Sequence, residues 1–223
     1  VWAAEPMLVN PTNIDVDEQG RIWVAEAANY RGSKMRPEGD RILILEDTDL
    51  DGKADKQTVF VQDPQLFAPL GVSKIGNKLY VSQSPYVWVY TIDESSGTPK
   101  PAGKPEVLFQ GFGGVNHDHG VHVVVPGPDG RLYFNSGNEG GGGYIKDAEG
   151  NPIVDQTNSE VGQGSKTYRG KPKGKDNVGY RQGLVFRFEP PPPATPSPVT
   201  RMRKYEESDY HVHVGGKEIG KHR

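Results

Sequence analysis

Cysteine is absent from the 223 residues of this chain. Disulfide bonds, thiolate chemistry and covalent attachment of a c-type haem are therefore excluded for these residues. Long apolar runs are also missing, since none approaches the roughly 20 residues that a membrane-spanning helix needs. The formal net charge is only −3, so charge does not favour nucleic acid or an anionic membrane as a partner. We expect no nucleic-acid partner.

Glycine and proline are abundant, with 29 and 19 residues respectively, as in proteins built from short strands and many turns. Residues 190–193 are four prolines, and a polar stretch follows them. We therefore expect a folded region over residues 1–189 and a Pro-rich, polar tail over residues 190–223. The first six residues read either as the end of a cleaved signal peptide or, better, as a strand already under way, in which case the chain begins inside its fold.

A unit of two short strands around a tight turn occurs three times. When the copies are aligned on Ile22, Leu79 and Leu132, they lie 57 and 53 residues apart. A third apolar strand follows each copy, and a fourth follows the first two. This pattern predicts an all-β chain with about three β-propeller blades, which cannot close a ring alone and need a larger protein or a second copy. Residues 140–180 interrupt the third copy and are expected to form a surface loop.

The most specific motif is the acidic loop, residues 47–55, which reads Asp-Thr-Asp-Leu-Asp-Gly-Lys-Ala-Asp. Calcium takes about six to eight oxygen ligands, and carboxylates at alternate positions of a tight loop converge on one point. Thr58 stands where a helix-flanked calcium loop has glutamate, and the flanks are strand-like, so we expect a structural ion between two strands. The alternative is an exposed acidic turn without metal. The predicted ligands are Asp47, Asp49, Asp51, Asp55 and the Lys53 carbonyl.

Three histidines and an aspartate precede the third hairpin: His117, Asp118, His119 and His122. Because imidazole titrates near neutral pH, this cluster could supply a proton acceptor or a metal ligand. The alternative for His122, which lies inside an apolar run, is that it simply packs in the fold.

Two further groups of residues have alternative interpretations. The aromatic side chains Trp23, Trp88 and Tyr133 could form sugar platforms, although core packing is the usual role at strand positions. His211 and His213 could bind a metal, but no third ligand lies at a defined spacing, and a solvated tail explains them equally.

Residues 11–17, 20–26 with 29–31, the acidic loop and residues 119–137 together resemble the N-terminal β-propeller of planctomycete-type membrane-bound dehydrogenases. The resemblance covers about residues 1–190. That family is in turn similar to the soluble pyrroloquinoline-quinone (PQQ) glucose and sorbosone dehydrogenases, which are six-bladed propellers. The resemblance therefore implies three blades of a six-bladed ring, calcium and PQQ as cofactors, and a secreted, periplasmic or extracellular location.

The resemblance also implies roles for individual residues. In the quinoproteins, the histidine eight positions before the glycine of a Gly-Pro-Asp turn is the base toward a sugar hydroxyl, and His119 stands in that place before Gly127. Asp118 or His117 would orient His119. Gly137 and Asn138 take cofactor-contacting positions, with Asn138 where the soluble enzymes have aspartate.

Two functions follow as alternatives. The first is a calcium-binding oxidoreductase propeller that oxidises a small sugar or alcohol, with a cytochrome c or a haem domain on another segment as electron acceptor. The haem-attachment motif of many relatives, Cys-x-x-Cys-His, is absent here because the chain has no cysteine. The second is a non-catalytic, calcium-stabilised propeller that binds a glycan or a protein.

Overall fold

The computed structural model describes residues 1–32, 36–113, 119–137, 144–155, 183–190, 211–214 and 217–221. Within these ranges the regular elements are antiparallel β-strands and one short 3₁₀ helix, η1 (Tyr30–Gly32). The all-β expectation is therefore confirmed. No helix in the described ranges is long and apolar enough to cross a membrane.

The first sheet, called blade 1, is an antiparallel meander in which each strand pairs with the next one along the chain. Its innermost strand alternates polar and apolar residues, whereas its two central strands are almost continuously apolar because both of their faces are buried. The sequence predicted this four-stranded unit. Its strands are β1 (Pro11–Val16), β2 (Ile22–Glu26), β3 (Arg41–Glu46) and β4 (Lys56–Gln62).

Blade 2 repeats the meander, and the two-residue strand β8 (Lys100–Pro101) pairs with its third strand. A hairpin extends its outer edge, formed by β12 (Tyr144–Asp147) and β13 (Pro152–Asp155). Within residues 140–180, which were expected to form a surface loop, the described residues 144–155 form this hairpin instead, because the short segments gain strand structure by pairing with the free edge of the blade. The four main strands are β5 (Gly71–Ile75), β6 (Lys78–Gln83), β7 (Tyr86–Asp93) and β9 (Glu106–Gln110).

Blade 3 is the third sheet, and it includes strands from the region expected to be a polar tail. Strands β15 and β16 form a hairpin that adds to β14, so pairing extends beyond the proline run, where no further strand was expected. The strands in order are β10 (Val125–Pro126), β11 (Leu132–Ser136), β14 (Leu184–Phe188), β15 (His211–Val214) and β16 (Lys217–Lys221).

Residues 1–10, called the N-terminal strap, form no strand, which corrects the expectation for the first six residues. The strap packs Trp2, Met7 and Leu8 against Val24 and Leu43 on the face of blade 1 that points away from blade 2. Its main chain is also fixed, since the amide of Ala54 donates to the Trp2 carbonyl at 2.8 Å. The strap is held mainly by apolar side-chain contacts and by few backbone hydrogen bonds. Its backbone therefore stays irregular, although its sequence looks like that of a strand.

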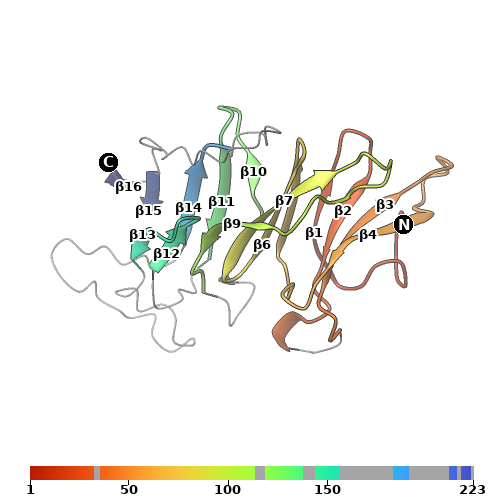
Figure 1. Ribbon diagram of the computed structural model, residues 1–223, viewed down its shortest axis with the longest axis horizontal. Helices are drawn as coiled ribbons and strands as arrows, with labels where there is room; N and C mark the ends of the chain where they lie inside the picture. The colour runs from red at the N-terminus through yellow and green to blue at the C-terminus, as the bar shows by residue number, and fades with distance from the viewer. Residues whose placement is uncertain are drawn as a thin grey trace.

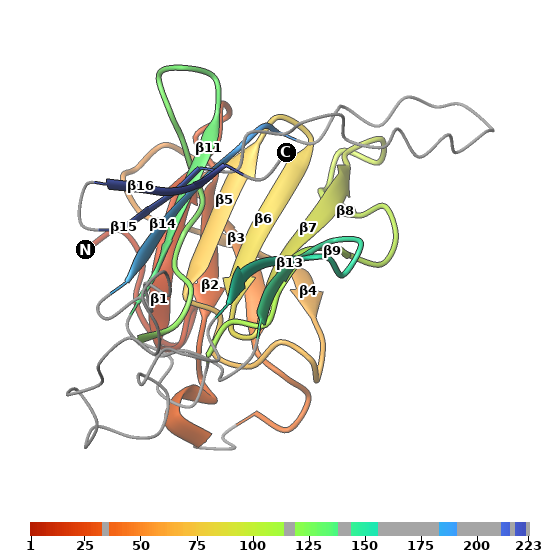
Figure 2. The same ribbon diagram turned by 90° about the vertical axis from the view of Figure 1, so that its left-hand side faces the viewer.

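The three blades lie side by side (Figures 1 and 2). Buried apolar side chains form one layer between blades 1 and 2 and another between blades 2 and 3. Trp23 and Trp88 belong to the layer between blades 1 and 2, where they are 0% and 5% exposed. Phe134 and Phe186 stack with ring centroids 4.5 Å apart in the layer that joins blades 2 and 3. Both tryptophans therefore pack in the core.

Side chains of β1 also hydrogen-bond to the backbone of β5. Asn13 accepts from Val72 N at 2.8 Å, and Asp15 accepts from Lys74 N at 2.7 Å. The innermost strands of blades 1 and 2 therefore run in the same direction, as successive propeller blades do.

This topology gives the sheets two different ends. One end, called the turn end, carries the connections that join β1 to β2, β3 to β4, β5 to β6 and β10 to β11, and the β3–β4 connection there is the acidic loop. The opposite end, called the loop end, carries the β2–β3, β4–β5 and β9–β10 connections, with η1 at the lower side of Figure 1. The acidic loop and His119 therefore lie at opposite ends of the strands.

Candidate functional site

The acidic loop joins β3 to β4 and brings three carboxylates together. Oxygens of Asp47, Asp49 and Asp51 lie within 4.8 Å of one another. Each carboxylate also accepts a hydrogen bond from the loop backbone: Asp51 N donates to Asp47 and Asp49 at 3.2 Å, and Lys53 N donates to Asp51 at 2.8 Å. Left-handed backbone at Leu50 and Gly52, with φ of 61° and 88°, makes this tight path.

Asp55, the fourth predicted ligand, makes a different contact. Its two oxygens accept hydrogen bonds from the backbone N and the hydroxyl of Thr48, at 3.0 and 2.7 Å. These bonds from Thr48 lower the pKa of Asp55 below its ordinary value. Asp55 thus bonds to Thr48 at the other end of the loop. The carboxylate cluster consists of Asp47, Asp49 and Asp51 and does not include Asp55.

The donor set of the acidic loop fits calcium. Hard divalent cations prefer carboxylate and carbonyl oxygens, and the clustered groups are three carboxylates on the outer rim of blade 1. An ion held there would offset the mutual repulsion of the carboxylates and fix the β3–β4 connection. At the turn end, such an ion would have a structural role, because the loop lies at the opposite end of the strands from His119.

The histidine segment, residues 119–124, is the last part of the β9–β10 connection at the loop end. His119 is exposed and His122 is half-buried, while Val121 and Val124 are buried in the core between blades 2 and 3. The hairpin turn after this segment forms as predicted, with Gly127 N donating to the Arg131 carbonyl at 2.7 Å. Of the predicted site residues in this region, His117, Asp118 and Asn138 lie outside the described residues.

Tyr133 lies at the other end of this hairpin. It is half-buried, and its hydroxyl donates to Asp129 at 2.7 Å. Its ring packs under the turn at Gly127. Tyr133 therefore braces the turn end of blade 3, away from His119.

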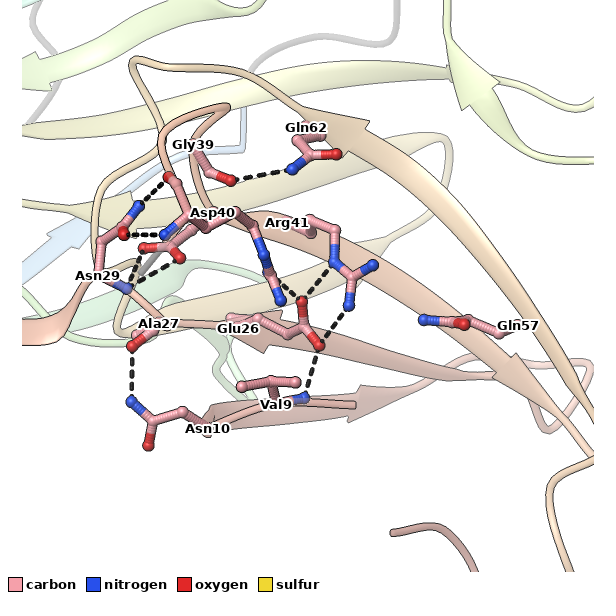
Figure 3. Close-up of polar contacts among 12 residues, drawn as sticks. Val9, Asn10, Glu26, Ala27, Asn29, Gly39, Asp40, Arg41, Gln57 and Gln62 are labelled. Atoms are coloured by element: carbon pink, nitrogen blue, oxygen red, sulfur yellow. Dashed lines mark hydrogen bonds and ion pairs between the residues drawn. The ribbon is translucent and has the colours of Figure 1, made fainter. Parts of the chain in front are cut away.

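A buried ionic network occupies the loop end of blade 1 (Figure 3). Glu26, at the end of β2, is fully buried and pairs with Arg36 at 2.6 Å and with Arg41 at 2.6 and 2.9 Å. The strap also reaches this carboxylate, since Val9 N donates to Glu26 at 2.7 Å. The network fixes both termini of the β2–β3 loop and the end of the strap around one charge.

Asp40 is the second buried carboxylate of the loop end. It accepts from Asn29 N at 3.1 Å and from Ala68 N at 2.7 Å, so it joins the β2–β3 loop to the β4–β5 connection. Burial raises the pKa of Asp40 above its ordinary value, and the N–H donors of Ala68 and Asn29 oppose that shift. Left-handed backbone at Arg31 and Ala68 accompanies this bonding.

A family model described as a domain of unknown function, DUF7133, matches residues 1–177 of the chain. The chain belongs to the DUF7133 family. No curated protein matches it in sequence.

Several solved structures are similar to this DUF7133 chain. An oxidoreductase of Thermus thermophilus, described as a glucose dehydrogenase, has 18% identity and a TM-score of 0.42, over 65% of this chain and 41% of its own. The PQQ domain of pyranose dehydrogenase from Coprinopsis cinerea has 17% identity and a TM-score of 0.43, over 82% and 44%. The calcium structure of a Trichoderma reesei family AA12 enzyme has 16% identity and a TM-score of 0.41, over 96% and 54%. The DUF7133 chain thus spans about half or less of each of these structures.

Sequence reasoning did not identify the Glu26 and Asp40 network. Its only local signal is a charged residue that directly ends an apolar strand, as Glu26 ends Ile-Trp-Val-Ala-Glu. The partners of Glu26 lie 10 to 17 residues away along the chain, and Ala68 lies 28 residues from Asp40. Such pairs become visible only when the strands are placed.

Proposed function

We propose that this chain forms calcium-binding blades of a dehydrogenase-like β-propeller that oxidises a small sugar or alcohol. The observation that carries the proposal is the position of His119. It is an exposed imidazole at the loop end, on a segment anchored by the buried side chains of Val121 and Val124. Catalytic residues are often placed in this way, on loops that a rigid scaffold positions.

In this proposal His119 accepts the proton of the substrate hydroxyl. A neutral imidazole nitrogen is a suitable acceptor near neutral pH, and general-base catalysis contributes roughly 10²–10⁴ in rate. His117 or Asp118 would orient the ring of His119. The electron acceptor would be a cytochrome c or a haem domain on another segment, and the protein would be secreted, periplasmic or extracellular.

The described residues fit the two proposed cofactors unequally. The acidic loop suits calcium, whereas PQQ carries carboxylates that call for cationic partners. Arg36 and Arg41, at the loop end of blade 1, are both paired with Glu26. PQQ is therefore proposed from the resemblance, which gives Gly137 and Asn138 their roles by their places in the sequence, and no hydride-transfer step is derived through it.

The test is dye-linked oxidation of a panel of sugars and alcohols by the full-length protein loaded with calcium and PQQ. His119→Ala should reduce kcat by roughly 10²-fold or more, while His122→Gln, in the same segment, should keep most of the activity. Calcium binding and thermal unfolding should match the wild type in both variants. Full activity in His119→Ala would remove His119 from the mechanism.

The alternative is a non-catalytic, calcium-stabilised propeller that binds a glycan or a protein partner. The observation in its favour is that two arginines of the loop end, Arg36 and Arg41, are paired with Glu26. The two proposals differ in a simple measurement, the quinone absorbance of the purified full-length protein after incubation with PQQ and removal of the excess. Retained absorbance supports the dehydrogenase, and its absence supports the binding propeller.

A further inference from the structure

The histidine segment is in close contact with two glycines from different blades. A Cβ atom on Gly137, at the end of β11, would lie 2.7 Å from the carbonyl carbon of His119 and even closer to its oxygen. A Cβ atom on Gly71, at the start of β5, would lie 2.6 Å from the Cα of Val123. Neither glycine has a left-handed φ, so space rather than backbone conformation requires glycine at both positions.

Hydrogen bonds hold the same segment from both sides. The hydroxyl of Ser84, in the β6–β7 turn of blade 2, accepts from Val121 N at 3.3 Å. From blade 3, the Asn135 carbonyl accepts from His122 N at 2.9 Å. The backbone of residues 120–122 is therefore bonded to two blades at once.

Gly137 also hydrogen-bonds to the histidine segment. Its N–H donates to the Gly120 carbonyl at 2.7 Å, next to the His119 carbonyl that a side chain at position 137 would displace. The clash would involve backbone atoms, which cannot turn aside as the end of a flexible side chain can. Any side chain at position 137 must therefore move either the end of β11 or the histidine segment.

We propose that Gly137 and Gly71 are positioning residues for His119. They set how closely the histidine segment approaches blades 2 and 3, and so fix the place of the imidazole at the loop end. The inference rests on the proposed function in one respect, that His119 is the functional histidine. In this proposal Gly137 acts by leaving space for the histidine segment, and that role requires no contact with a cofactor.

The experiment compares Gly137→Ala and Gly71→Ala with Gly103→Ala, a matched control because a Cβ there meets open space. The first readout is the NMR ring-proton signals of His119 in the full chain, identified by their loss in His119→Gln. Both tight-site variants should shift the His119 signals, and Gly103→Ala should leave them unchanged. In the dye-linked assay Gly137→Ala should lower kcat by about 10²-fold, as a displacement near 1 Å does, with a smaller change in KM.

Ser84→Ala provides a second test in case Gly137→Ala does not fold, because it removes one hydrogen bond without adding volume. It should shift the same His119 signals while the protein stays folded. Wild-type His119 signals in folded Gly137→Ala, or in Ser84→Ala where Gly137→Ala does not fold, would overturn the inference. Full oxidation by His119→Ala would instead overturn the proposed function, and the NMR result would still decide whether the glycines position the segment.

Discussion

The acidic loop at the turn end and the buried carboxylates Glu26 and Asp40 at the loop end differ in how their charges are accommodated. At the turn end, the carboxylates of the acidic loop are largely exposed and bond to backbone at most five residues away. At the loop end, Glu26 and Asp40 are fully buried and bond to partners 10 to 28 residues away. The acidic loop thus takes its geometry from residues close to it in sequence, whereas the Glu26 and Asp40 contacts depend on the assembled fold.

The largest effect that this comparison predicts is at Glu26. Glu26→Ala would leave Arg36 and Arg41 without their shared counter-ion and Val9 N without its acceptor. Removing one partner from a buried ion pair costs about 3–5 kcal/mol, so we expect a loss of that size in urea unfolding.

The control for Glu26 is Glu46→Ala. Glu46 pairs with Lys56 at 2.7 Å on a partly exposed part of blade 1, and an exposed pair contributes about 1 kcal/mol or less. Equal losses in the two variants would contradict the distinction between a buried, long-range network and surface pairs.

The second prediction concerns calcium at the turn end. A ligand at 100 times its Kd that binds only the folded state raises the free energy of unfolding by about 2.7 kcal/mol. Chelator should remove that increment from the wild type, and Asp49→Ala should abolish the response. Asp93→Ala, which changes a half-buried carboxylate of β7 outside the loop, should keep it. A wild-type melting temperature that is insensitive both to added calcium and to chelator would show that the loop is only an acidic turn.

The blades and the acidic loop were predictable because both are local patterns. Alternating residues in β1 and the apolar run of β3 indicate their own strands, and Asp47, Asp49 and Asp51 are close in sequence as well as in space. The hairpin β12–β13 and strand β15 were not expected, because polar segments become strands only at the free edges of β9 and β14.

The third prediction uses Asp17, a turn-end carboxylate that is buried. Burial disfavours its charge, but hydrogen bonds from Trp23 Nε1 at 2.9 Å and Arg21 Nε at 2.6 Å lower the pKa of Asp17 below its ordinary value of 3.8. Asp17→Asn should therefore cost about 1.5–3 kcal/mol at pH 7, the usual contribution of a hydrogen bond to a charged group.

The pH dependence of Asp17 has a definite sign. A lowered pKa in the folded state contributes stability that is present above pH 3.8 and is lost as the pH falls through the folded value. The deficit of Asp17→Asn relative to the wild type should therefore shrink below about pH 4. A deficit that stays constant down to pH 2.5 would argue against a stabilised Asp17 carboxylate.

The smallest predicted effect is at Asp40, where the sign reverses. Burial raises the pKa of Asp40 above 3.8, with the N–H groups of Ala68 and Asn29 opposing the shift. The folded state then binds the proton more tightly than the unfolded state does, so this group's contribution to stability is full below pH 3.8 and declines as the pH rises through the folded pKa.

Asp40→Asn loses one acceptor but also removes a buried charge, so its cost at pH 7 should be about 1 kcal/mol. As the pH falls toward 4, the wild type should gain stability relative to Asp40→Asn, whereas below about pH 4 it should lose stability relative to Asp17→Asn. Urea unfolding of both variants from pH 7 to pH 3 measures the two slopes, and slopes of the same sign would show that the carboxylates at the two ends of blade 1 do not differ in this way.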